Sequence, residues 1–286
     1  METKSIRVMW FVPPLLAMVA SLEAPAVVVD GRRNRSSDEQ FEALVAGEVD
    51  AVVTSMDNVI GWNRRPGPGD FRVVAQVEQT TPLTLVSHPR LRRLHELRGS
   101  NLLVDAPDNG FVVALRAMLR DAGLESDAFQ LTPAGGVKER FDALLAGVGD
   151  ATLLGPPFDA MAIQAGLERM ITVQEQYPAF PGQGVVVRAG SSARASVQGW
   201  VRALEKARRD VLQNPELARR AVTGAGLPLA VADTMIVLNP VTLRPTPEGI
   251  ALLVAHRKSL NLEGADNDYS TIVDDSMVKE LIGGEQ

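Results

Sequence analysis

The sequence FEALVAGEVDA, residues 41–51, recurs one hundred positions later as FDALLAGVGDA, residues 141–151. Seven of the eleven pairs are identical. In each copy, apolar residues at i, i+3 and i+4 predict a short helix, and Gly47 or Gly147 predicts its left-handed end. The aspartate then opens an apolar run typical of a buried strand. Each copy therefore predicts the same helix–turn–strand unit.

Two interpretations of this repeat remain open. The copies are either two ordinary αβ units that resemble each other by chance, or equivalent parts of two α/β lobes that face each other across a cleft. The period is too long for a solenoid, and we favour the two lobes. Open α/β sheets bind ligands at the carboxyl ends of their strands, which here lead into residues 55–58 and 155–158.

A third strand–turn–helix unit lies between the copies, at residues 102–122. Phe111, Leu115 and Met118 give it a helical stripe, and Gly123 predicts its end. Asp108 or Asn109 would cap the helix and leave free N–H groups to meet a ligand. We expect the pair Gly135-Gly136 to do the same before a helix at residues 137–146.

Strand-like segments flank the middle of the chain at residues 82–87 and 184–188. We expect both to cross between the lobes as a two-stranded hinge. The first lobe would then be discontinuous, residues 1–83 and 187–286, and the second, residues 84–186, would be inserted into it.

The amino terminus has an apolar stretch at residues 8–20, which resembles a signal peptide but is interrupted by Pro13 and Pro14. We favour a strand followed by a helix that opens at these prolines. The other expected elements are a strand at 26–30, a capping box at 37–40, a helix around 197–212, a helix from Thr246 toward Leu260, and a short helix within 273–282.

The composition, the net charge and the missing motifs exclude several classes of function. The chain has 286 residues, of which 45% are hydrophobic and 22% charged, as in an ordinary globular protein. Its net charge of −6 argues against nucleic acid as a partner. Cysteine is absent, and so are the HExxH, GxSxG, P-loop and strand-borne GxGxxG motifs. We therefore expect no metal, no cofactor and no catalytic residue.

Residues 41–58, 97–111 and 141–158 resemble ABC-transporter substrate-binding proteins with the type 2 periplasmic-binding fold. The most similar group binds aliphatic sulfonates, taurine, nitrate or thiamine pyrimidine precursors. The similarity extends over about residues 6–250. It implies an α/β fold of two lobes with a two-strand hinge and an interlobe cleft. It also implies a protein that closes on a small organic ligand and delivers it to a membrane permease.

The resemblance, together with the turns and aromatic residues above, places the ligand contacts at Trp10, Phe11, Ser55, Met56, Asp57, Asn58, Thr80, Thr81, Asp108, Asn109, Gly110, Phe111, Gly135, Pro156, Phe158 and Tyr177. The aromatic rings could stack a planar ligand, although Phe11 and Phe111 would also suit an ordinary core. Asp57 and Asp108 would either pair with a ligand amine or cap helices. These loops contain no arginine, so they show no bidentate site for a sulfonate or carboxylate. An anion could still bind to helix N-termini alone.

A second function from another class stays open: a cytoplasmic enzyme on the same fold, such as a lyase or decarboxylase acting on a small aromatic or carboxylated substrate. It would need an ionisable group in the cleft, with His88, Asp57 and Asp108 as candidates. We expect a periplasmic or cell-surface location if an export signal was trimmed, and a cytoplasmic one otherwise.

Overall fold

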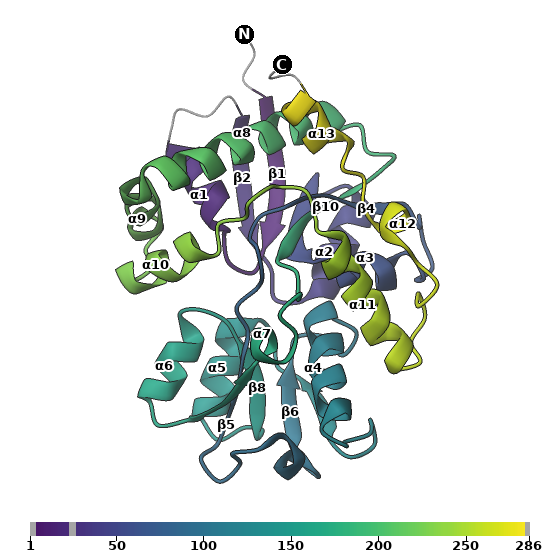
Figure 1. Cartoon of the computed structure of the whole chain (residues 1–286), viewed down its shortest axis with the longest axis vertical. Coiled ribbons are helices and arrows are strands. Elements are labelled where there is room, and N and C mark those ends of the chain that lie inside the picture. The colour runs from purple at the N-terminus through teal and green to yellow at the C-terminus, as the bar shows by residue number, and fades with distance from the viewer. Residues whose placement is uncertain (1–3, 23–26, 284–286) are drawn as a thin grey trace.

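The computed structural model describes residues 4–22 and 27–283, which form two five-stranded sheets one above the other (Figure 1). The first sheet has the order β2-β1-β3-β10-β4 and the second the order β7-β6-β8-β5-β9. The expected two-lobed α/β fold is confirmed.

In the first sheet, β1 pairs in parallel with both β2 and β3, while β10 lies antiparallel between β3 and β4. Its strands are β1 (Lys4–Trp10), β2 (Val27–Arg33), β3 (Ala51–Ser55), β4 (Phe71–Gln76) and β10 (Gln183–Arg188). The predicted strand at 26–30 corresponds to β2, although residue 26 lies outside the described residues.

The second sheet repeats this plan. β6 pairs in parallel with β7 and β8, while β5 lies antiparallel between β8 and β9. Its strands are β5 (Thr84–Ser87), β6 (Asn101–Val104), β7 (Gln130–Pro133), β8 (Ala151–Leu154) and β9 (Glu168–Thr172). Each sheet thus receives one antiparallel strand beside the repeated strand, β10 beside β3 and β5 beside β8.

The helices cover both faces of the sheets (Figure 1). They are α1 (Leu15–Leu22), α2 (Ser37–Ala46), α3 (Asp57–Trp62), η1 (Leu94–Leu97), α4 (Gly110–Asp121), α5 (Val137–Leu145), α6 (Phe158–Gln164), α7 (Val173–Gln176), α8 (Arg194–Gln213), α9 (Pro215–Gly224), α10 (Leu229–Val237), α11 (Pro247–Ser259), α12 (Tyr269–Ile272) and α13 (Ser276–Gly283). Within the described part of the chain, no helix is both long and apolar enough to span a bilayer.

Strand β3 shows how the core is arranged. Val53 packs with α1 and α8 on one face of the first sheet, whereas Val52 faces the other side, where α2 and α3 lie. The strand is therefore buried on both faces, which explains why its sequence is continuously apolar rather than alternating. The cluster that contains Val52 continues into the second lobe through Leu102 and Leu115, so the two lobes share a hydrophobic contact.

The sequence repeat is also a repeat of interactions. Asp50 accepts a hydrogen bond from the backbone N–H of Arg7 in β1 at 2.8 Å, and Asp150 accepts one from Asn101 in β6 at 2.7 Å. Each aspartate also donates its own N–H to the carbonyl of that same strand residue. Gly47 and Gly147, with φ of 69° and 77°, end the preceding helices as predicted. The two interpretations are thereby resolved in favour of equivalent units.

The backbone crosses between the sheets at residues 77–83 and 173–182. The prediction that the strand-like segments themselves form the crossing is wrong, because β5 belongs wholly to the second sheet and β10 wholly to the first. Both were expected to cross because apolar strands next to a lobe boundary look the same whichever sheet they join. The predicted boundary at 186/187 falls inside β10.

Two helix starts differ from expectation by a few residues. The cap of α2 is Ser36, whose side chain accepts from the N–H of Glu39, so the capping interaction lies one residue earlier than predicted. Helix α13 begins at Ser276 because Val273 is extended and bridges to Val73 in β4. The long helix α8 and its break at Asn214, and α11 with its Thr246 cap, are confirmed.

Replacing Asp50 with alanine should lower the free energy of unfolding by about 1–3 kcal/mol, because the Arg7 N–H loses its partner. Burial disfavours the charged form of Asp50, but the hydrogen bonds from Arg7 outweigh it and lower its pKa. The loss should therefore be full at neutral pH and shrink as the pH falls below about 3.9 and through the lowered pKa. Urea denaturation measures it, with exposed Asp30→Ala as control. Equal stability of both variants would contradict the assignment.

Candidate functional site

A cavity lies between the two lobes, with about 1000 Å³ of space counting its opening to solvent. It is bordered by the carboxyl ends of β1, β6 and β8, by the first turns of α4 and α5, by the first crossing segment, and by Gln183 at the start of β10. Most of its wall is apolar, and the first lobe adds Met235 of α10 and Leu238, the residue after that helix. This is the edge at which open α/β sheets bind ligands.

Five of the sixteen predicted contact residues line this cavity: Phe11, Thr81, Asn109, Phe111 and Pro156. Asn109 caps α4, with its side chain accepting from the N–H of Phe111 at 2.7 Å, and this cap turns the first turn of α4 toward the cavity. Phe111 also contacts Phe180 of the second crossing segment, at 6.4 Å between ring centroids. Phe111 is thus part of the hydrophobic core and also part of the cavity wall, so both expectations for it are met.

The block at residues 55–58 does not line the cavity. Ser55, Met56, Asp57 and Asn58 are all buried; Ser55 and Asp57 face Gly110 at the start of α4, whereas Met56 lies against Gly184 in β10. The Oδ1 of Asn58 accepts a hydrogen bond from the N–H of Gly110 at 2.8 Å. A Cβ on Gly110 would lie 2.4 Å from the Ser55 hydroxyl oxygen, so only glycine permits this approach. These residues join the lobes behind the cavity.

Asp57 pairs with an arginine two hundred residues away. Its side chain is fully buried, and Arg257 of α11 donates to Oδ1 at 2.8 Å and to Oδ2 at 2.6 Å. Arg257 also donates to the carbonyl of Glu263 at 2.9 Å. The carboxylate is therefore occupied within the protein rather than directed at a ligand.

The other predicted contacts lie outside the cavity wall for separate reasons. Trp10 covers Gly31 between β1 and β2, and Thr80 accepts from Gln174 in the crossing region. Phe158 packs on Phe141, with 5.4 Å between the ring centroids. Tyr177 lies against His256, with 4.4 Å between the ring centroids, and its hydroxyl donates to Asp121. Asp108 is exposed, and Gly135, at φ 86°, offers its carbonyl to Arg140.

Arg140, on α5, is a cavity residue that the sequence interpretation missed. Its side chain is 12% exposed and donates to Thr152 Oγ1 at 3.1 Å, the Gly135 carbonyl at 3.0 Å and the Leu153 carbonyl at 3.1 Å. The absence of arginine from the loops therefore did not mean an absence of arginine from the site. Burial lowers the pKa of Arg140, and Asp105 opposes that effect.

Asp105 follows β6 and lies 4.0 Å from the Arg140 guanidinium. It accepts from the Ser37 N–H at 3.2 Å and from the Asn109 amide at 2.8 Å. Burial raises its pKa, and Arg140 together with these hydrogen bonds opposes the rise. The contact with Ser37, at the start of α2, brings the first lobe to the same point.

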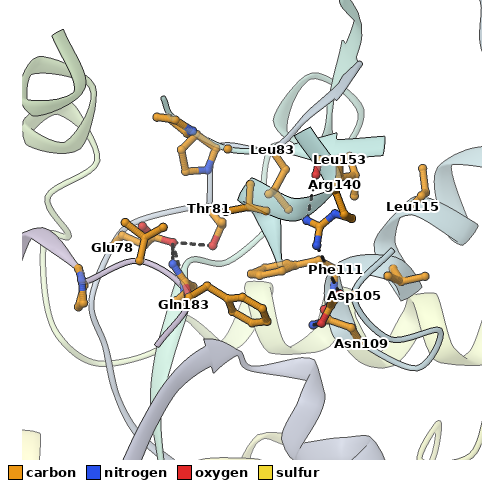
Figure 2. A pocket seen from close by; sticks show the side chains of 18 of the residues that line it. Glu78, Thr81, Leu83, Asp105, Asn109, Phe111, Leu115, Arg140, Leu153 and Gln183 are labelled. Carbon is orange, nitrogen blue, oxygen red and sulfur yellow. Dashed lines mark hydrogen bonds and ion pairs between the residues drawn. The ribbon is translucent and has the colours of Figure 1, made fainter. Parts of the chain in front are cut away.

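A second polar group lies on the other side of the cavity, where Glu78, Thr81 and Gln183 meet (Figure 2). Oε1 of Glu78 accepts from the Thr81 hydroxyl at 2.6 Å, and from the backbone N–H and side-chain amide of Gln183 at 3.2 Å each. Burial raises the pKa of Glu78, and these three donors oppose the rise. The group also ties the first crossing segment to the start of β10.

One sequence signal could have indicated Arg140, because it lies at i+3 from Val137 and thus on the apolar stripe of α5. A charged side chain on the stripe of a predicted buried face marks a site that needs a partner. Glu78 and Gln183 carry no comparable pattern, because each belongs to an irregular junction and they meet only in the folded chain.

No family model matches this sequence, and no curated protein matches it. Among solved structures, the ligand-binding component of an ABC-type import system from Staphylococcus aureus, with zinc bound, superposes with a TM-score of 0.80 at 13% identity, over 97% of this chain and 98% of that one. The chain has the fold of ABC-importer binding proteins.

Two further structures support the same fold. The alkanesulfonate-binding protein SsuA from Xanthomonas axonopodis pv. citri, bound to MOPS, gives a TM-score of 0.72 at 16% identity, over 92% of this chain and 95% of that one. The periplasmic nitrate-binding protein NrtA from Synechocystis PCC 6803 gives a TM-score of 0.76 at 10% identity, over 100% of this chain and 90% of that one.

The three ionisable residues predicted for an enzyme on this fold do not line the cavity. His88 follows β5, where its N–H donates to the carbonyl of Asp150, and neither it, Asp57 nor Asp108 belongs to the cavity wall. Within residues 4–22 and 27–283, no cluster of three or more histidine, aspartate or glutamate side chains could hold a metal ion.

Arg257→Met should lower the free energy of unfolding by about 3–5 kcal/mol, because it leaves the Asp57 carboxylate buried without its partner. Adding Asp57→Asn should recover part of that loss. Chemical denaturation measures both, and Arg64→Met, which breaks an exposed pair with Asp266, should cost no more than about 1 kcal/mol. Equal stability of Arg257→Met and the wild type would contradict the role given to this buried pair.

Proposed function

We propose that this protein is a solute-binding protein, which closes its two lobes on a small organic ligand and delivers it to an ABC-type permease in the membrane. The observation that carries the proposal is the cavity itself. Its wall comes from the strand ends of both sheets and from the first crossing segment, so a ligand inside it touches both lobes. Such a ligand favours the closed arrangement because it binds that arrangement more tightly.

The crossing segments support a hinge in this role. The chain before residue 77 and after residue 182 would move as one lobe and residues 84–172 as the other, with the change of backbone angles taken up in residues 77–83 and 173–182. A short irregular segment can absorb such a change, whereas a strand paired inside a sheet cannot without losing its ladder. The protein would then work on the outer side of the membrane, in the periplasm or at the cell surface.

The ligand site would combine the five predicted residues with the newly found ones. Phe11, Phe111 and Met235 supply apolar surface, and Glu78 and Arg140 supply the polar groups at the two sides. The named neighbours bind alkanesulfonate and nitrate, so such anions belong in a first screen together with amines and pyrimidines. The enzyme alternative gains no specific observation, and we propose no catalytic step.

Ligand binding in this cavity predicts that a compound from the screen raises the melting temperature and makes the particle more compact in solution scattering. Met235→Trp should reduce the affinity for that compound at least about tenfold, because the larger ring fills part of the cavity. Val237→Trp, on the same helix but 82% exposed, is the matched control and should bind normally.

The proposal fails if no compound shifts the melting temperature, or if the compound that does so binds Met235→Trp and the wild type equally. Delivery to a permease has its own test, in which the liganded protein should stimulate ATP hydrolysis by the importer reconstituted in vesicles. Equal hydrolysis with and without the protein would remove the transport part of the proposal.

A further inference from the structure

The polar groups of the cavity lie at two opposite sides, with Phe111 between them (Figure 2). Arg140, Asp105 and Asn109 form one group, while Glu78, Thr81 and Gln183 form the other. The charged side chains of the wall are Glu78, Asp105 and Arg140, which means two carboxyl groups against one guanidinium.

The guanidinium of Arg140 is already engaged. Three of its N–H groups donate to protein oxygens, two of them backbone carbonyls, and its charge faces Asp105. The equivalent position in the first lobe is Gln40, whose amide donates to the Val53 carbonyl at 3.1 Å, as Arg140 does to Leu153. The contact with the strand is thus a structural feature of the repeat, and the charge added in the second lobe is balanced by Asp105.

The carboxylate of Glu78, unlike the guanidinium of Arg140, is only partly paired within the protein. All three of its hydrogen bonds end on Oε1, and no residue in the described part of the chain donates to Oε2 or forms an ion pair with this carboxylate. Three donors on one oxygen favour the charged form of the group, whereas burial favours the neutral form and raises its pKa. Oε2 has no protein donor, so a cation beside it would favour the charged form further.

We propose that the cavity selects organic cations: an ammonium or amidinium group of the ligand pairs with Oε2 of Glu78, and the apolar body of the ligand lies against Phe111 and the aliphatic wall. Organic anions are excluded because Asp105 already balances Arg140. This inference rests on the proposed solute-binding function and adds the chemical class of the solute.

Three compounds with one ring and different charge test the choice: benzamidine, benzamide and benzoate. Calorimetric titration of the wild type should rank them with the cation first and benzoate last. Glu78→Gln should weaken benzamidine about tenfold or more and leave benzamide within about twofold, because only the charge-assisted pair is lost. Glu42→Gln, the same substitution at an exposed position of α2 outside the cavity, should change neither affinity.

Circular dichroism and the melting temperature of the unliganded variants establish that each is folded. The inference is overturned if benzoate, or any anion of the broader screen, binds the wild type more tightly than benzamidine in a manner that Met235→Trp abolishes. It is also overturned if Glu78→Gln binds benzamidine as tightly as the wild type. The first result would leave the solute-binding function intact, whereas failure of every compound to bind would remove the function as well.

Discussion

The two crossing segments are the constraint on which the rest of the structure depends, and Glu78 of the first is joined to Gln183, the residue directly after the second. Val77 donates to the carbonyl of Gln183, and Gln183 donates twice to Glu78, so the start of the first segment lies beside the end of the second. Because each segment leads directly into a strand of a sheet, this contact turns the ligand-binding edges of the two sheets toward each other. The same carboxylate then forms part of the cavity that results, which connects the fold to its function.

The repeat explains how two similar lobes produce a site that is not symmetric. Position 40 of the first copy is a buried glutamine, and position 140 of the second is an arginine. Both nevertheless donate to equivalent carbonyls of the adjacent strands, those of Val53 and Leu153. A glutamine satisfies that carbonyl without adding charge, whereas the arginine needs a counter-charge, which Asp105 supplies. The polar chemistry of the second lobe thus follows from one substitution within a shared framework.

Much of the fold could be predicted from the sequence, because its determinants are local. The helix stripe, the glycine end and the aspartate of residues 41–51 all act within a few residues, and they recur at 141–151. The site could be predicted only in part. Asn109 and Phe111 were accessible because a cap fixes its own helix start, but Asp57 was misassigned because its partner, Arg257, lies two hundred residues away. Glu78 and Gln183 acquire a role only once the crossing segments meet.

Closure and selectivity are coupled if the cavity takes a cation. Direct contacts between the lobes already exist, because Asn58 accepts from the N–H of Gly110 at the start of α4 and Ser37 donates to Asp105 in the cavity wall. These contacts are available with or without a ligand, so they cannot distinguish one solute from another. Glu78 can, because closing the lobes takes its carboxylate further from water, and only a ligand that supplies a positive group offsets that loss. The lobes should therefore stay closed around a cationic solute and reopen around a neutral or anionic one, because only the cation pairs with the Glu78 carboxylate.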